Sequence, residues 1–183
     1  FPNVSLRADS KAAGRWDVSG GGEYFAVGVG GAMTGRGADL LIIDDPHSES
    51  AGINPSIEYF DGVYEWYSSG PRQRLQPGGS IIIVMTRWHQ SDLTGQIVDA
   101  SEKRKGADKW EVIELPALYD SGEPLWPDFW SKDELNAIKA ELPSSKWLSQ
   151  YQQKPTAEEG ALIKREYWRE WDYQDPPACD YII

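Results

Sequence analysis

Two consecutive carboxylates, Asp44 and Asp45, stand directly after the apolar run of residues 40–43. A short, continuously apolar run predicts a strand that is buried on both faces of a parallel sheet. Open α/β sheets bind ligands at the carboxyl ends of their strands, which is where these two acids would lie. In nucleotide hydrolysis the first carboxylate can hold Mg²⁺, and the second can orient or deprotonate the attacking water. A strand that ends in an acidic turn without catalytic function is the alternative.

A second apolar run, residues 81–85, ends in Thr86 and Arg87. Because the carboxyl ends of neighbouring parallel strands lie side by side, these residues would face the two aspartates. There Thr86 can hydrogen-bond a γ-phosphate or the attacking water, and Arg87 can supply positive charge or form a structural ion pair. The alternative is that Thr86 caps the next helix and Arg87 is merely solvated. The aspartate pair on the first strand favours the catalytic interpretation.

The glycine-rich stretch 30–37 has the G-x-x-x-x-G spacing of a phosphate-binding loop. We reject that assignment because Arg36 and Gly37 replace the required lysine and hydroxyl residue, and because no room remains for a helix before residue 40. We expect instead that the glycines expose Arg36 on a loop at the edge of the site. An arginine there can stabilise transition-state charge, in its own subunit or in a neighbouring one. A solvated arginine in a glycine-rich turn is the alternative.

The elements that must position these residues alternate along the first part of the chain. Apolar runs predict strands at residues 40–43, 81–85 and 110–115, and the spacing of apolar and aromatic residues predicts helices at 55–67 and 92–100. This alternation is typical of an α/β fold with a parallel sheet.

The residue composition changes after Pro116, where prolines and aromatic residues predict an ordered but irregular connection. Ser131 and Glu134 then have the spacing of a capping box, which predicts the start of a helix. A second short helix is expected over residues 146–153. We therefore place a boundary near residue 116.

Composition excludes several classes of protein. The 183 residues include 18 Lys and Arg against 29 Asp and Glu, and the formal net charge of −11 argues against a surface that coats nucleic acid. The single cysteine, Cys179, rules out an internal disulfide and suits a reducing compartment. His47 and His89 lack a third nitrogen or sulfur ligand, so we expect surface or supporting histidines rather than metal ligands. No run approaches the roughly 20 apolar residues that span a bilayer, so no membrane is expected.

Taken in order, these motifs resemble the large subunit of tailed-bacteriophage terminases, the motors that package viral DNA. The resemblance covers most of the chain, from about Phe25 onward. The residues that carry it are Gly35–Pro46 (GRGADLLIIDDP), Met85–Gly95 (MTRWHQSDLTG), Leu115–Ala117, Leu125–Pro127, Tyr151–Pro155 and Gly160.

The resemblance implies an additional-strand P-loop ATPase fold, here incomplete, that binds ATP and Mg²⁺. Asp44 matches the carboxylate associated with the metal and Asp45 the catalytic carboxylate, which is Glu in many relatives. Thr86 falls in the motif that couples hydrolysis to movement, and Arg87, beside it, is assigned to cofactor binding. Arg36 matches an arginine finger.

The same resemblance implies a division of the chain. Residues 1–116 would be the C-terminal part of the ATPase domain, 117–178 a linker, and 179–183 the start of the first strand of a ribonuclease-H-like nuclease. The phosphate-binding loop would lie upstream of Phe1, so we expect the 183-residue chain by itself to hydrolyse ATP negligibly.

The family also implies partners and a location. The partners would be double-stranded DNA, the portal protein, the small terminase subunit and further copies of the chain in a ring. The location would be the host bacterial cytoplasm and, transiently, the portal of the procapsid.

Two other interpretations stay open at this point. Asp44-Asp45-Pro46-His47 has the spacing of a DExH helicase box, although a helicase should continue into a second similar α/β domain rather than a stretch rich in Pro and Trp. A non-catalytic prophage remnant that binds a packaging partner is the other, although the retained site residues argue against decay.

Overall fold

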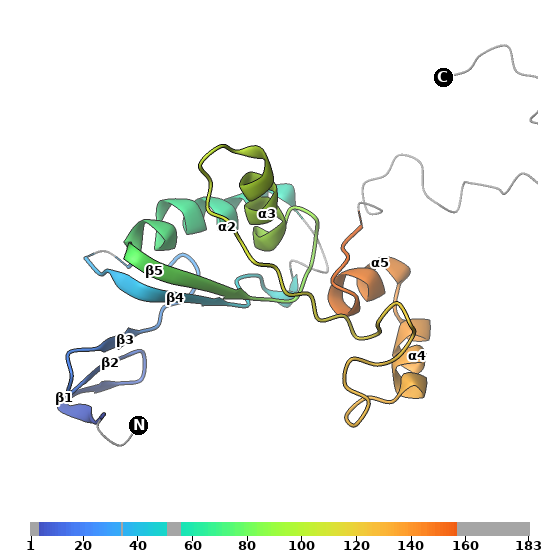
Figure 1. Cartoon of the computed structure of the whole chain (residues 1–183), viewed down its shortest axis with the longest axis horizontal. Helices are drawn as coiled ribbons and strands as arrows, with labels where there is room; N and C mark the ends of the chain where they lie inside the picture. The colour runs from blue at the N-terminus through green and yellow to red at the C-terminus, as the bar shows by residue number, and fades with distance from the viewer. Residues whose placement is uncertain (1–3, 34, 51–55, 157–183) are drawn as a thin grey trace, which may run out of the picture. The chain divides into compact units, whose positions relative to one another are not determined.

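The computed structural model describes residues 4–33, 35–50 and 56–156 of the chain (Figure 1). Its contacts divide the chain into two compact units between Ile113 and Glu114, beside the boundary expected near residue 116. The strand expected at 179–183, and the end of the expected linker from residue 157 onward, lie outside the described residues. None of the helices in the described ranges is long and apolar enough to cross a bilayer.

The first unit begins with a three-stranded antiparallel sheet made of β1 (Leu6–Ala12), β2 (Arg15–Val18) and β3 (Glu23–Phe25). Trp16 on β2 pairs with Tyr24 on β3, and their rings stack with centroids 4.7 Å apart. Cross-strand aromatic pairs of this kind stabilise antiparallel strands.

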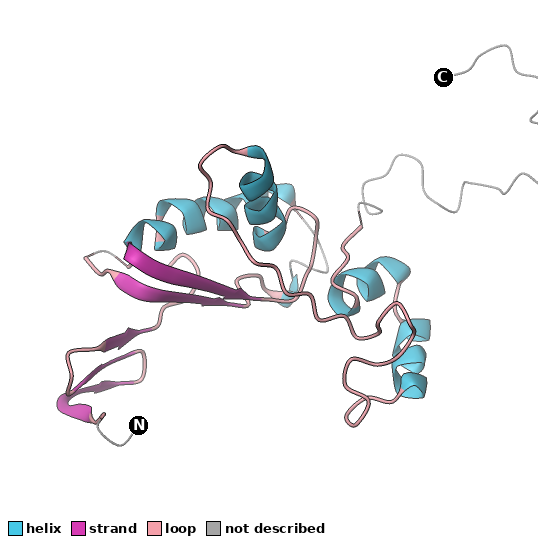
Figure 2. Ribbon diagram, in the orientation of Figure 1, coloured by secondary structure: helices cyan, strands magenta, loops and turns pink. Residues whose placement is uncertain are grey.

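A parallel pair of strands follows, β4 (Ala38–Asp44) and β5 (Leu75–Val84), in register from Leu40 opposite Ser80 to Asp44 opposite Val84. The connection between them contains α2 (Ile57–Ser69) and a 3₁₀ turn, η1 (Pro71–Arg74), and α3 (Leu93–Lys103) comes after β5. The expectation of a mixed α/β fold with parallel strands is confirmed for this pair (Figure 2).

The apolar run predicted a strand at 81–85, but β5 already begins at Leu75. It can do so because a β-bulge accommodates the glycines that precede the run. The pairing shifts between Ala38 and Leu40, and Gly78 has a φ of +83°, in the left-handed region that favours glycine. A Cβ on Gly79 would lie 2.9 Å from the Asp39 carbonyl oxygen. Glycines therefore let the two strands approach each other closely at the bulge.

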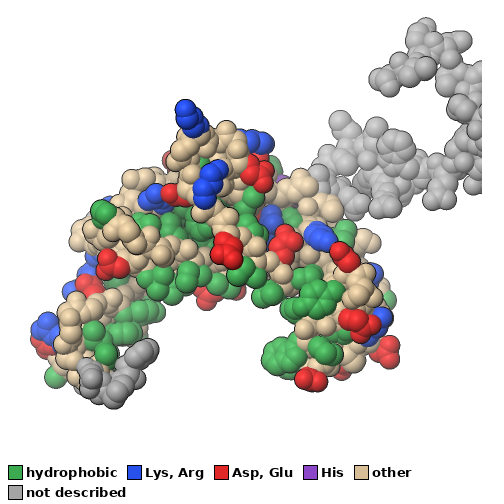
Figure 3. Space-filling view, viewed as in Figure 1, with side chains coloured by type: hydrophobic (Ala, Val, Ile, Leu, Met, Phe, Trp, Pro, Cys, Tyr) green, Lys and Arg blue, Asp and Glu red, His purple; other side chains and the backbone are tan. Residues whose placement is uncertain are grey.

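Only one face of the β4–β5 sheet is covered in the described residues, so the prediction of burial on both faces is wrong there. On the covered face Ile43 packs in a core with helix residues, namely Val63, Tyr67, Leu93 and Ile97. On the other face, apolar side chains are between 47% and 59% exposed; these are Leu40, Ile42, Ile82 and Val84. Figure 3 shows hydrophobic side chains at this surface. The uniform apolar run did not reveal that the helices cover one side alone.

The strand expected at 110–115 is absent: these residues form no ladder and belong to no helix. Val112, Ile113 and Leu115 are all more than half exposed. Among the described residues no strand pairs with this segment, and an apolar run without a partner does not become a strand.

In the described part of the second unit, an irregular stretch over residues 114–131 is followed by helices. The predicted capping box is confirmed, because the Ser131 side chain accepts from the Glu134 N–H while the Glu134 side chain accepts from the Ser131 N–H at the start of α4 (Lys132–Glu141). The helix expected at 146–153 is α5 (Ser144–Lys146) continued by a π-helical turn, η2 (Trp147–Tyr151). Leu135 and Trp147 are buried in this unit.

Candidate functional site

Asp45 and Thr86 meet where the two parallel strands end. The backbone N–H of Asp45 donates to the Val84 carbonyl oxygen at 2.9 Å, and Oδ1 of Asp45 accepts from the Thr86 N–H at 3.3 Å. Asp45 has a φ of +40°, which is uncommon for a residue other than glycine. Backbone strain of this kind clusters at functional sites. Here the two hydrogen bonds with the end of β5 hold Asp45 in this conformation.

Asp44 is the last residue of β4 and its side chain is exposed. Side chains alternate along a strand, so Asp44 lies on the same face as Leu40 and Ile42, the face that the helices leave uncovered. No group of three or more His, Cys, Asp or Glu side chains in the described ranges could hold a metal ion by itself. An exposed carboxylate at a strand end does fit Mg²⁺, which is held by one or two carboxylates together with waters and substrate phosphates.

Arg87 turns its side chain to Asp92. Its Nε donates to both carboxylate oxygens of Asp92, at 2.9 and 3.1 Å, and Asp92 is fully buried. Of the two functions that the sequence left open for Arg87, this geometry favours the structural ion pair over contact with a nucleotide.

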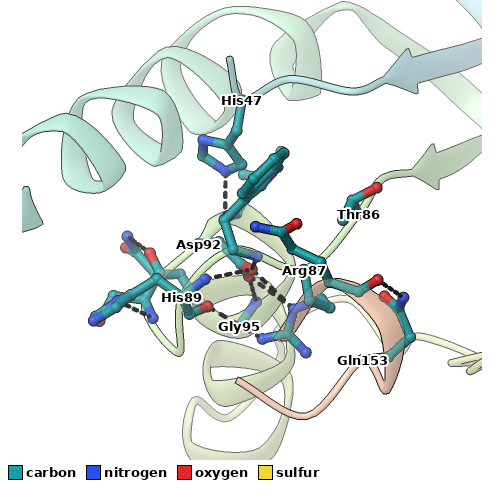
Figure 4. Close-up of polar contacts among 12 residues, drawn as sticks. His47, Thr86, Arg87, His89, Asp92, Gly95 and Gln153 are labelled. Atoms are coloured by element: carbon teal, nitrogen blue, oxygen red, sulfur yellow. Dashed lines mark hydrogen bonds and ion pairs between the residues drawn. The ribbon is translucent and has the colours of Figure 1, made fainter. Parts of the chain in front are cut away.

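Asp92 organises the whole connection from β5 to α3, and sequence reasoning assigned it no part in the site. It is the N-cap of α3, where its Oδ1 accepts from the Gly95 N–H at 2.9 Å, and its Oδ2 accepts from the Trp88 N–H at 3.0 Å (Figure 4). A Cβ on Gly95 would overlap the Gln90 carbonyl oxygen, so the tight turn requires glycine. The signal was in the sequence: an aspartate directly before a helical apolar pattern is a strong N-cap.

His47 ties the end of β4 to the start of α3. It is buried, and its Nε2 accepts from the Leu93 N–H at 2.9 Å while its ring lies edge-on to Phe60 with centroids 5.2 Å apart. Burial lowers the pKa of the imidazole below its ordinary value of 6.5, although the nearby Asp92 carboxylate opposes the shift. Because Nε2 accepts the hydrogen bond from Leu93, the imidazole supports the loop, and His47 is a supporting rather than a surface histidine.

His89 also contacts Phe60: the two rings stack with centroids 5.1 Å apart. Its Nδ1 accepts from the Ser91 N–H at 3.0 Å, so this histidine also supports the connection between β5 and α3.

Arg36 is not brought to the aspartates. It forms an ion pair with Glu23, and its guanidinium carbon lies 4.5 Å from the centre of the Phe25 ring, both on β3. The side chain is 28% exposed, less than the expected loop arginine would be, because a carboxylate and an aromatic ring lie within its reach. Arg36 precedes β4 and Asp45 follows it, and a strand of seven residues is about 20 Å long, so the two lie at opposite ends of the strand.

Comparison with models of known protein families, and with curated proteins, finds no match for this chain. The fold and the site together define a mixed α/β protein with a parallel strand pair. At the carboxyl ends of that pair, a carboxylate is hydrogen-bonded to the second residue after the neighbouring strand.

Proposed function

We propose that this chain is part of the large subunit of a phage-type terminase, in which ATP hydrolysis drives double-stranded DNA into a procapsid. The hydrogen bond between Asp45 and Thr86 is the observation that carries the proposal, since it joins the two motifs that the terminase resemblance assigns to hydrolysis and to coupling. Their position at the carboxyl ends of parallel strands is also where nucleotides bind in α/β folds.

Each residue of the site would have a distinct task. Asp44 holds Mg²⁺, which when bound neutralises charge on the phosphates. Asp45 orients or deprotonates the attacking water: its Oδ1 is engaged by Thr86, so the carboxylate is fixed in orientation and Oδ2 is directed to the water. A change at the γ-phosphate would then reach Thr86 through Asp45 and pass along the Asp92-centred connection into α3.

Arg36 would act on a neighbouring subunit. Its separation from Asp45 by the length of β4 excludes a direct contact in the same subunit with the fold unchanged. An arginine supplied by a neighbour requires a ring of copies, as the terminase resemblance implies, and release of Arg36 from Glu23.

The remaining partners follow from the resemblance alone. They are double-stranded DNA, the portal protein and the small terminase subunit, and an endonuclease would belong to the same protein. With a net charge of −11, we expect the contact between this chain and DNA to be local.

The test uses the protein encoded by the whole reading frame that contains this sequence. We expect DNA-stimulated ATPase activity that Asp45→Asn removes. Asp39→Asn is the matched control, because Asp39 is an exposed aspartate on the same strand, near its opposite end, and its substitution should leave activity unchanged. Full activity in Asp45→Asn, or an equal loss in both variants, would contradict the assignment.

A further inference from the structure

The second unit carries an exposed cluster of three aromatic side chains, Trp126, Phe129 and Trp130, which we call the aromatic cluster. We propose that it is a docking surface for a protein segment in which large apolar side chains are flanked by Lys or Arg. This inference goes beyond the ATPase function and does not depend on it.

The backbone holds the aromatic cluster in a tight turn. The N–H groups of Phe129 and Trp130 both donate to the Trp126 carbonyl oxygen, at 3.1 and 3.0 Å. Pro127 restricts the chain inside the turn, and Ser131 caps α4 immediately after it. Little conformational entropy would therefore be lost from this surface when a partner binds, which favours affinity.

The three rings pack on one another and still face solvent. Trp126 stacks on Phe129 with centroids 5.0 Å apart, and Phe129 meets Trp130 edge-on at 5.5 Å. Trp126 and Phe129 are each 62% exposed and Trp130 is 42% exposed. Contiguous apolar patches of this kind mark interaction sites, and tryptophan is among the residues that contribute most to binding at protein interfaces.

The charges around the aromatic cluster select the kind of partner. Asp128 lies inside the turn, and Asp120, Glu123 and Asp133 are exposed nearby in the same segment. Glu123 is paired with Lys132 at 3.6 Å and Asp120 with Lys154 at 3.7 Å, so these charges partly balance one another. Asp128 and Asp133 add negative charge that these two pairs do not balance. Figure 3 shows acidic beside hydrophobic side chains on this unit. Carboxylates around the aromatic cluster repel phosphates, which disfavours nucleic acids and anionic membranes as partners. They attract Lys and Arg side chains of a protein partner.

The test is selection of a displayed library of random peptides on the purified chain, followed by binding measurements with the selected peptide. We expect enrichment of sequences with aromatic or aliphatic anchors flanked by Lys or Arg. Trp126→Ser should weaken binding of the selected peptide by about tenfold or more, whereas Ile113→Ser removes an apolar side chain that is even more exposed, on the first unit, and should not. Circular dichroism would confirm that the variants are folded.

A second variant tests whether the carboxylates around the aromatic cluster attract the basic residues of the peptide. Asp128→Lys should weaken the same peptide and strengthen an analogue in which Glu replaces its basic residues, while Glu111→Lys, a reversal at an exposed site on the first unit, should do neither. The proposal is overturned if no peptide is enriched over the Trp126→Ser protein, or if the enriched peptides are acidic. It is equally overturned if the cluster instead mediates self-association that Trp126→Ser abolishes, or binds a single-stranded oligonucleotide more tightly than the basic peptide.

Discussion

Oδ1 of Asp45 accepts a hydrogen bond from the backbone N–H of Thr86, and this contact joins the ends of two parallel strands although the two residues are 41 positions apart in the chain. It gives each residue a fixed orientation that neither has alone. Neighbouring residues support the contact between Asp45 and Thr86. Arg87 pairs with the buried Asp92, and His47 accepts a hydrogen bond from the first turn of α3. The strand ends and α3 are therefore one connected unit.

Removing the Asp92 carboxylate should destabilise the chain strongly. Asp92→Ala removes the acceptor of the Arg87 Nε and of several backbone N–H groups, and we expect the free energy of unfolding to fall by about 3–5 kcal/mol in a urea titration. Asp92→Asn keeps a capping oxygen and should cost less. The control is Asp99→Asn on the same helix, where the ion pair with Lys103 is exposed and contributes little to stability. Equal losses at both positions would contradict the description of the loop.

Gly95→Ala should destabilise the chain for a steric reason. The new Cβ would overlap the Gln90 carbonyl oxygen, and we expect a loss of about 1–3 kcal/mol in the same titration. Gly62 provides a matched control because it lies inside α2 with open space around it. Gly62→Ala should increase stability by about 0.5–1 kcal/mol, so the two substitutions have opposite signs.

Stability should fall as the solution is acidified below the ordinary histidine pKa of 6.5. Burial lowers the pKa of folded His47, so the unfolded chain binds a proton before the folded chain does. The contribution is fully present above pH 6.5 and is lost as the pH falls toward the lowered pKa of the folded state. In His47→Gln the amide oxygen can accept from the Leu93 N–H without titrating, and comparison of its pH–stability curve with that of the parent chain isolates the effect. Superimposable curves would show that His47 does not titrate in this way.

Mixing experiments can separate the two possible modes of action of Arg36. In the protein encoded by the whole reading frame, we expect Arg36→Ala to lower DNA-stimulated ATPase activity by about 10³-fold, the typical effect of an arginine finger. Combining Arg36→Ala subunits with Asp45→Asn subunits places an intact arginine beside an intact aspartate at some interfaces, so part of the activity should return. Absence of recovery in mixed rings of proven composition would argue against action between subunits.

Much of the fold was predictable because its signals are local. The parallel strand pair, the two helices packed on it and the capping box at Ser131 and Glu134 all come from patterns within a few residues of each other. The strand expected at 110–115 failed because a strand needs a partner, which a run of apolar residues does not specify. The sequence also did not predict that only one face of the β4–β5 sheet is covered, because an apolar run does not specify which elements pack against it.

By itself, the sequence determined which residues stand at the strand ends, because apolar runs and the residue types that follow them are properties of neighbours along the chain. Only the tertiary structure decided how those side chains are used. It joined Asp45 to Thr86, turned Arg87 toward Asp92 and held Arg36 against Glu23. Each choice depends on which partner comes within hydrogen-bonding distance once the chain has folded, and Glu23 and Asp92 are partners that the motifs alone did not indicate.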